Sequence, residues 1–167
     1  EVAARFSELC YILFGVHNKE EKLGNMFLST CNSTMVQQWM YNIGGCYPKA
    51  KYIPGCIMQS RQCIHRAFIR GLFEDGTVNV KNQMADHIEW STCFPRLLME
   101  VQVVLTRLGF ITGYTKKQRR NLYLYGKEVS KYRKEIGFVS HFKQQRAALP
   151  TADSTRYRVP VPREYAC

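Results

Sequence analysis

Two parts of the sequence show the same pattern about 93 residues apart. Residues 8–15 (ELCYILFG) and 100–109 (EVQVVLTRLG) are apolar segments that end at a glycine, and the two glycines are 94 residues apart. Residues 35–44 (MVQQWMYNIG) and 129–137 (VSKYRKEIG) both close in Ile-Gly, with glycines 93 residues apart. Two landmarks at nearly the same offset predict a duplicated unit and therefore a pseudo-symmetric molecule.

The second unit shows a complete pattern of helices and strands. Between residues 95 and 108, apolar side chains recur every three or four positions, as in an amphipathic helix. Similar patterns predict helices at 62–74, 127–136 and about 140–148, and strands at 77–80, 86–90, 110–114 and 120–125. The order αββαββα predicts an α+β domain in residues 56–149.

The first unit, residues 1–55, shows only the second half of this pattern. It starts at the equivalent of the second helix, so we expect its own first helix and hairpin to lie upstream of Glu1. Residues 150–167 are rich in proline and arginine and are expected to form an extended tail.

The charge of the chain indicates an anionic partner. The chain has 24 Lys and Arg against 13 Asp and Glu, a formal net charge of +11. Residues 115–149 carry ten of the positive and two of the negative side chains, interleaved with aromatic residues. Such a surface is typical of proteins that follow a phosphate backbone, so we expect a nucleic acid. A basic surface that serves only solubility is the alternative.

Several other classes of protein have no support in the sequence. No apolar run approaches the roughly 18 residues of a membrane span, so no membrane partner is expected. The seven cysteines include no C-x-x-C pair, which predicts reduced thiols in an intracellular compartment, whether cytoplasm, nucleus or organelle. The signatures of P-loop nucleotide hydrolases, serine esterases and zinc proteases are absent.

One predicted helix ends in two acidic residues within the segment FIRGLFEDGTV. Ala67 and Gly71 lie four residues apart on one helical face, which leaves room for a second helix. Glu74 and Asp75 close the helix. Two such helices that cross at their small residues would bring these carboxylates together to bind a divalent metal for attack on a phosphodiester. Ordinary packing followed by a turn is the alternative.

Together with its neighbouring blocks, this segment resembles the LAGLIDADG homing endonucleases, most closely those embedded in inteins. The resemblance covers about residues 5–147. It includes YLYGKEVSKYRKEIG and FVSHFKQQR in the second unit, the lysine-and-proline block KYIP at 51–54, and the segments at 9–16, 35–44 and 97–109. The family implies an α+β fold with curved antiparallel sheets and pseudo-two-fold symmetry, here with an incomplete first repeat.

The resemblance also implies a catalytic centre that uses Mg²⁺ or Mn²⁺. The metal ligand of the family is the last acidic residue before the signature glycine, a position that Asp75 matches. The motif is one residue shorter than usual, so Glu74, Asp75 or neither would face the metal. The catalytic lysines of the family look like Lys51 and Lys143, which are 92 residues apart. A lysine there would polarise water or stabilise charge on the phosphate, and a solvated lysine is the alternative.

The family places its sheets in the major groove of double-stranded DNA, where β-ribbons read base edges. The corresponding loop and strand hold Lys116, Lys117, Arg119 and Arg120, and helix residues Lys131, Arg133 and Lys134 would contact the DNA backbone.

The leading hypothesis is therefore a site-specific, metal-dependent DNA endonuclease that cleaves both strands of a long target. It needs a second signature helix, from a missing N-terminal segment or from another copy. The second hypothesis is a catalytically inactive relative that binds DNA or RNA, as in RNA splicing. The third is a structural component of a ribonucleoprotein.

Overall fold

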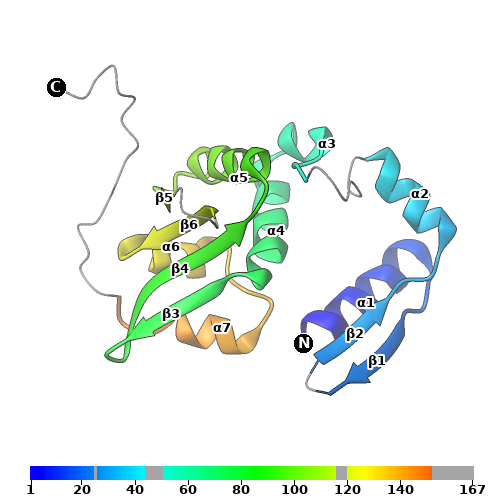
Figure 1. Ribbon diagram of the computed structural model, residues 1–167, viewed down its shortest axis with the longest axis horizontal. Helices are drawn as coiled ribbons and strands as arrows, with labels where there is room; N and C mark the ends of the chain where they lie inside the picture. Colours follow the sequence, from blue (N-terminus) through cyan, green and yellow to red (C-terminus); the bar gives the residue numbers. More distant parts are fainter. Residues whose placement is uncertain (25, 44–50, 116–119, 152–167) are drawn as a thin grey trace.

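The computed structural model describes residues 1–24, 26–43, 51–115 and 120–151. The chain forms two units that lie side by side along the long axis of the molecule (Figure 1). No helix within the described ranges is long and apolar enough to cross a membrane.

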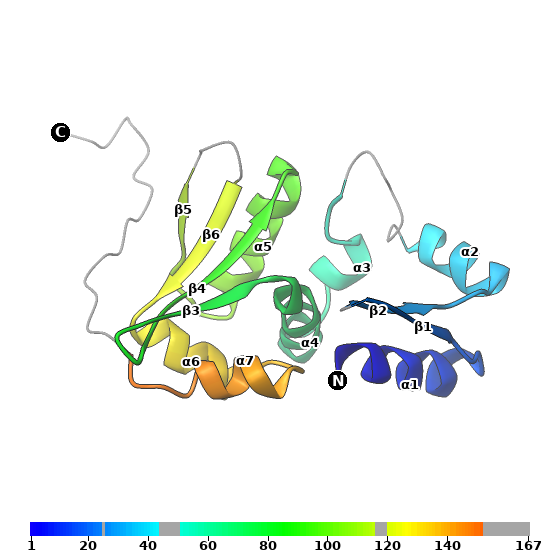
Figure 2. The ribbon, with the colours of Figure 1, turned by 60° about the horizontal axis from the view of Figure 1, so that its bottom comes forward.

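A four-stranded antiparallel sheet organises the second unit. Its strands are β3 (Thr77–Lys81), β4 (Met84–Thr92), β5 (Gly113–Thr115) and β6 (Arg120–Tyr125), in the spatial order β3-β4-β6-β5. The accompanying helices are α3 (Gly55–Met58), α4 (Gln62–Leu72) with its 3₁₀ extension η1 (Phe73–Asp75), α5 (Pro95–Arg107), α6 (Lys127–Glu135) and α7 (His141–Arg146). Figure 2 shows α4, α6 and α7 on the same side of the sheet. The predicted α+β order αββαββα is confirmed.

The core of the second unit lies between the sheet and the helices. Ile88 of β4 and Leu124 of β6 have no exposed surface, and Leu105 of α5 is equally buried. The ring centroid of Tyr132 in α6 lies 5.3 Å from that of Phe73 in η1. Burial of a large apolar side chain contributes about 1.5–3 kcal/mol, so the residues whose alternation predicts the strands also stabilise the fold.

One predicted strand is shorter than expected. We predicted a strand at 110–114, whereas β5 covers only the end of that range. The N–H of Phe110 donates to the carbonyl of Leu105 (2.9 Å), and the N–H of Ile111 donates to the carboxylate of Glu128 in α6 (3.2 Å). Because these amide groups are bonded to α5 and α6, they do not extend the ladder with β6.

The first unit has the order αββα, with α1 (Val2–Phe14), β1 (Lys19–Leu23), β2 (Met26–Thr30) and α2 (Thr34–Asn42). Its two strands pair in antiparallel fashion. Helix α5 begins and ends 93 residues after α1, and α6 begins and ends 93 residues after α2. Gly15 after α1 and Gly109 after α5 both have a left-handed backbone, with φ of 65° and 80°, which glycine adopts readily.

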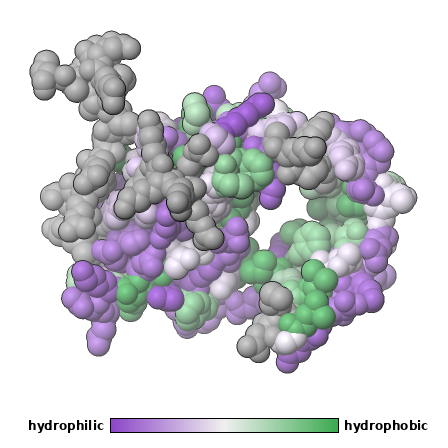
Figure 3. Space-filling view, in the orientation of Figure 1, coloured by the Kyte–Doolittle hydropathy of each residue, from purple (hydrophilic) through white to green (hydrophobic). Residues whose placement is uncertain are grey.

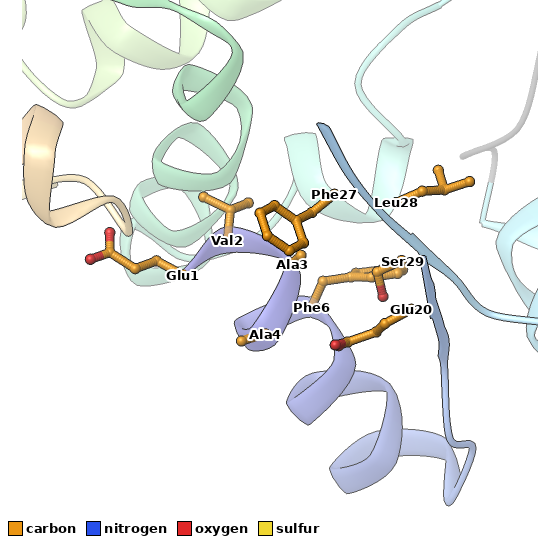
Figure 4. A pocket seen from close by; sticks show the side chains of 9 residues that line it. All are labelled: Glu1, Val2, Ala3, Ala4, Phe6, Glu20, Phe27, Leu28 and Ser29. Carbon is orange, nitrogen blue, oxygen red and sulfur yellow. The ribbon is translucent and has the colours of Figure 1, made fainter. Parts of the chain in front are cut away.

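The first unit leaves much of its apolar surface exposed. Among the described residues of 1–43, Cys10 is the one buried side chain, whereas Ile12 and Phe27 are 64% and 71% exposed. Hydrophobic side chains border the opening between the two units (Figure 3). Figure 4 shows a hollow beside α1 and β2 that is lined by Glu1, Val2, Ala3, Ala4, Phe6, Glu20, Phe27, Leu28 and Ser29.

Residues 51–54, which the repeat pattern places in the first unit, pack against the second. Ile53 is 1% exposed and belongs to the same core as the sheet and its helices. Its N–H donates to the carboxylate of Glu100 in α5 at 2.6 Å. The block KYIP is therefore anchored on α5.

Candidate active site and nucleic-acid interface

Helix α4 presents an open face at the edge of the second unit nearest the first unit (Figure 2). His65 and Ile69 of this helix are buried, whereas Ala67 and Gly71 are exposed. A Cβ added to Gly71 would meet no atom within 4 Å. The small residues predicted to pack against another helix thus lie on a face that is free to receive one.

The glycine that follows Asp75 is required by a close approach of two backbone segments. A Cβ at Gly76 would lie 2.7 Å from the carbonyl oxygen of Glu89 in β4 and 3.1 Å from that of Phe73. Any other residue here would collide with main-chain atoms that cannot move independently. This contact fixes where the helix ends and therefore where Asp75 lies.

The two acidic residues at this helix end differ in their surroundings. The side chain of Glu74 is 7% exposed, and its Oε1 accepts hydrogen bonds from the N–H groups of Val139 and Ser140, the latter at 3.2 Å. Glu74 thereby anchors the segment that leads into α7. Asp75 is exposed, and its carboxylate forms no hydrogen bond or ion pair within the described part of the chain. Asp75 is consequently the carboxylate that is free to bind a ligand.

Lys143 of α7 holds the backbone on both sides of Asp75. Its ammonium group donates to the carbonyl oxygens of Glu74 and Gly76, the second at 2.8 Å. Burial lowers the pKa of Lys143 below its ordinary value, and the negative charges of Glu74 and Asp75 partly oppose this shift. The lysine thus brings a positive charge to the end of the signature helix.

Lys51, the other predicted catalytic lysine, has a different environment. It is exposed, and its Nζ lies 5.7 Å from the ring centroid of Phe94, just before α5. This cation–π contact is typical of a partly solvated lysine. The structure therefore brings Lys143 to the backbone around Asp75 and places Lys51 beside α5.

The outer face of the sheet carries a polar and aromatic network that was not predicted from the sequence. Nδ1 of His87 in β4 donates to the carboxylate of Asp86 (2.7 Å), and its Nε2 accepts from the amide of Asn79 in β3 (3.0 Å). The amide of Asn121 in β6 donates to the carboxylate of Glu89. The alternation of these polar residues with buried ones in β4 and β6 is a signal that could have located this face.

A single domain is thus formed by α4 with η1, the four strands, α5 and α6. Its signature helix ends in an exposed carboxylate, that of Asp75. Residues 64–137 match the model of the LAGLIDADG-like domain. This match supports the LAGLIDADG family, whose members are usually nucleases that bind DNA. No curated protein matches the chain. We refer to residues 64–137 as the LAGLIDADG-like domain.

The basic residues predicted to contact DNA lie only partly within the described residues of the LAGLIDADG-like domain. Lys116, Lys117 and Arg119 lie outside the described residues, and Arg120 begins β6. Lys131, Arg133 and Lys134 belong to α6, in the helical layer behind the sheet. Lys131 donates to the carbonyl of Gly109 and lies 4.6 Å from the ring centroid of Phe110, so it joins α6 to the end of α5.

One carboxylate at the end of the signature helix is exposed and is of the type that binds a divalent metal together with a substrate. Within the described residues, no group of three or more His, Cys, Asp or Glu side chains is arranged to hold a metal ion. Mg²⁺ in phosphoryl-transfer sites is commonly bound by one or two carboxylates together with phosphate oxygens of the substrate. Asp75 is one exposed carboxylate of this kind among the described residues.

Proposed function

We propose that this chain acts in a site-specific homing endonuclease that cleaves both strands of a long DNA target with Mg²⁺ or Mn²⁺. The observation that carries this proposal is the exposed carboxylate of Asp75, at the end of the open face of α4, which has no hydrogen bond or ion pair with the described residues. A second helix packed on Ala67 and Gly71 would bring its own terminal carboxylate next to Asp75. The match of residues 64–137 to the LAGLIDADG-like domain supports this function.

The chemistry assigned to each residue follows from its position. Asp75 would hold the divalent ion, which when bound stabilises charge on the phosphate and lowers the pKa of attacking water. Lys143 would hold the carboxylate in place through the carbonyls of Glu74 and Gly76 and add a positive charge beside the phosphate. Glu74 is assigned a structural role, because its Oε1 is occupied by two N–H groups.

The internal correspondence between the units supports a two-repeat architecture. In the second unit, β6 lies between β4 and β5, whereas β2 pairs only with β1 among the described strands. The apolar hollow of the first unit lies beside β2. We propose that a segment of the type α4-β3-β4, from an N-terminal segment or another copy, covers this hollow and supplies the second signature helix. An intein host and a reducing intracellular compartment remain proposals from the sequence.

The cleavage test compares two variants that each remove one negative charge from the helix end. The full-length protein, together with any segment that precedes Glu1, is incubated with a plasmid library of random target sites in Mg²⁺, and in EDTA as a blank. We expect cleaved targets with the wild type and with Glu74→Gln, whose amide oxygen still accepts the N–H bonds. We expect none with Asp75→Asn. Cleavage that survives Asp75→Asn, or a library that stays intact with every protein, would contradict the proposal.

The lone carboxylate also supports a second candidate function, that of a nucleic-acid-binding relative without cleavage. In the described residues Asp75 has no acidic partner in a metal-binding group. For such a protein, DNA or RNA binding would be the same for wild type and Asp75→Ala and would not depend on a divalent metal. The binding assay therefore separates this function from that of the nuclease.

A further inference from the structure

Two thiol groups of the first unit are in direct contact. Cys10 belongs to α1, and Cys31 directly follows β2. Neither is in a disulfide, and the thiol of Cys31 is hydrogen-bonded to that of Cys10. Because the two residues are far apart in the chain, it is the packing of α1 on β2 that brings the sulfur atoms together.

A second contact between α1 and β2 gives the same alignment. The hydroxyl oxygens of Ser7 in α1 and Ser29 in β2 are 2.9 Å apart. Cys10 lies one helical turn after Ser7 on the same face of α1, and Cys31 lies two positions after Ser29 on the same side of the strand. Since α1 and β2 run in the same direction (Figure 1), the serine contact leads directly to the cysteine contact.

The two thiols differ in their access to solvent. Cys10 is 4% exposed, whereas Cys31 is half-buried. A small oxidant in solution therefore reaches Cys31 first, and Cys10 is the neighbouring thiol that can react with the oxidised sulfur. An accessible cysteine beside a second, resolving cysteine is the arrangement in which reversible oxidation ends in a disulfide.

We propose that Cys10 and Cys31 form a reversible intramolecular disulfide when the protein is exposed to a peroxide. The thiolate of Cys31 attacks the O–O bond, so that one oxygen stays on sulfur as a sulfenic acid and the other leaves as hydroxide. The sulfur of Cys10 then attacks the sulfenic sulfur, the S–S bond forms, and its proton and the hydroxyl group leave as water. One peroxide thus takes up two electrons and becomes two waters, and a dithiol reductant reverses the change. This site is independent of Asp75 and of any metal.

The surroundings of Cys31 determine how readily it reacts. Burial, and then the neighbouring Cys10 thiol, raises the pKa of Cys31 above its ordinary value of 9.0. The thiolate is the reacting form, so we expect oxidation to be slow at neutral pH and faster in alkaline buffer. The pair therefore remains reduced under reducing conditions and forms the disulfide only when the peroxide persists.

The disulfide would act on the part of the molecule that has the smallest core. A cross-link between α1 and the end of β2 reduces the conformational freedom of the unfolded chain, so local opening of the first unit becomes rarer. The hollow in Figure 4 has Phe6 of α1 on one wall and Phe27 of β2 on the other. The same cross-link would limit how far these two walls can separate.

The test treats the full chain, at low concentration, with hydrogen peroxide and maps its peptides without reductant. Trypsin cuts after Lys19 and Lys22, so Cys10 and Cys31 fall in different peptides. We expect the wild type to yield these two peptides joined, with a mass about 2 Da below their sum because two hydrogens are lost. Dithiothreitol should separate them again.

Two variants identify the bond. The peptide that contains Cys31 also contains Cys46, so Cys31→Ser should abolish the joined peptide if Cys31 is the partner of Cys10. Cys63→Ser removes an exposed thiol in α4 and is the matched control, which should give the joined peptide as the wild type does. Fragment-ion sequencing of the joined wild-type peptides identifies the bonded cysteines without any substitution.

Limited proteolysis measures the consequence for the first unit. We expect cleavage within residues 1–43 to be roughly 10-fold or more slower in the oxidised wild type than in the reduced protein, since a disulfide makes the open state rarer. Peroxide should not slow this cleavage in Cys31→Ser, whereas Cys63→Ser should respond as the wild type does.

Three results would overturn the disulfide. The first is that the peroxide-treated wild type yields no peptide that joins Cys10 to Cys31. The second is that the joined peptide forms equally fast in urea, which would show that the fold does not bring the thiols together. The third is an equal yield of the joined peptide from Cys31→Ser, which would assign the bond to Cys46. None of these measurements involves DNA or a metal, so failure of the disulfide is distinguishable from failure of the nuclease.

Discussion

The ammonium group of Lys143 lies 4.0 Å from the Oε2 oxygen of Glu74, and the two side chains are only 18% and 7% exposed. The same ammonium group binds the carbonyl oxygens of Glu74 and Gly76. Asp75 lies between these two residues in the chain, so its position depends on the packing of α7. Lys143, a predicted catalytic lysine, and Glu74, one of the two predicted metal ligands, thus support the helix end that carries Asp75.

Removal of the lysine charge should destabilise the domain. We expect Lys143→Met to lower the free energy of unfolding by about 2 kcal/mol, because Glu74 would remain largely buried without its counter-charge. Urea denaturation measures this change. Lys134→Met, at an exposed position of α6, is the matched control and should change stability by no more than about 0.5 kcal/mol. Equal stability of Lys143→Met and wild type would show that the contact does not support the site.

Stability should fall at alkaline pH because of Tyr132. Burial, and then the charge of Glu74, raise the pKa of this phenol well above its ordinary value of 10.0, while Arg70 partly lowers it. Above pH 10 the unfolded chain releases the phenolic proton and the folded chain retains it, so the stabilising contribution is lost as pH rises toward the folded pKa. The lowered pKa of Lys143 acts in the opposite direction and is the smaller shift.

The variant Tyr132→Phe isolates this effect. It should reduce the alkaline loss of stability while it changes the free energy of unfolding at pH 7 by less than about 1 kcal/mol, since the hydroxyl forms one long hydrogen bond, 3.4 Å to the carbonyl of Ile69. Tyr41→Phe, at an exposed tyrosine, serves as control. Thermal unfolding between pH 7 and about pH 11 gives the comparison. If Tyr132→Phe loses as much stability between pH 7 and about pH 11 as the wild type does, this phenol does not cause the alkaline loss.

The hairpin between β3 and β4 should gain stability from a glycine. Asn82 and Gln83 both have positive φ, 51° and 60°, in a two-residue connection. Asparagine tolerates this conformation, whereas glutamine is strained by roughly 1 kcal/mol. We therefore expect Gln83→Gly to raise the free energy of unfolding by about 1 kcal/mol and Asn82→Gly to raise it less. A larger gain in the free energy of unfolding for Asn82→Gly than for Gln83→Gly, measured by chemical denaturation, would contradict this explanation of the turn.

The elements of the LAGLIDADG-like domain were predictable because their signals are local. The apolar spacing of α5 and the alternation in β6 each lie within one segment, and both elements occur where they were expected. The missing part of the strand at 110–114 was not predictable in this way, because the N–H of Ile111 is taken by Glu128, which lies farther along the chain.

The difference between Glu74 and Asp75 was also beyond local reasoning. Adjacent acidic residues at a helix end look alike in the sequence, and only the N–H groups of Val139 and Ser140 decide that Glu74 turns inward. Lys131 is similar, since its contact with Gly109 depends on how α6 packs on α5. The candidate site residues could therefore be predicted from the sequence. Which of them support the structure and which stay exposed depends on tertiary contacts, which the sequence does not show.

A pair of glycine substitutions tests whether the face of α4 receives another helix. Gly71→Ala should raise the free energy of unfolding by about 0.5 kcal/mol, because alanine favours a helix and its methyl group would meet nothing within 4 Å. The same methyl group would hold a crossing helix away, so we expect cleavage to fall. Gly76→Ala should instead lower stability by about 2 kcal/mol through its contact with the carbonyl of Glu89. Greater stability of Gly71→Ala with full cleavage would show that no helix packs on this face, and the second carboxylate would then have to approach Asp75 from elsewhere.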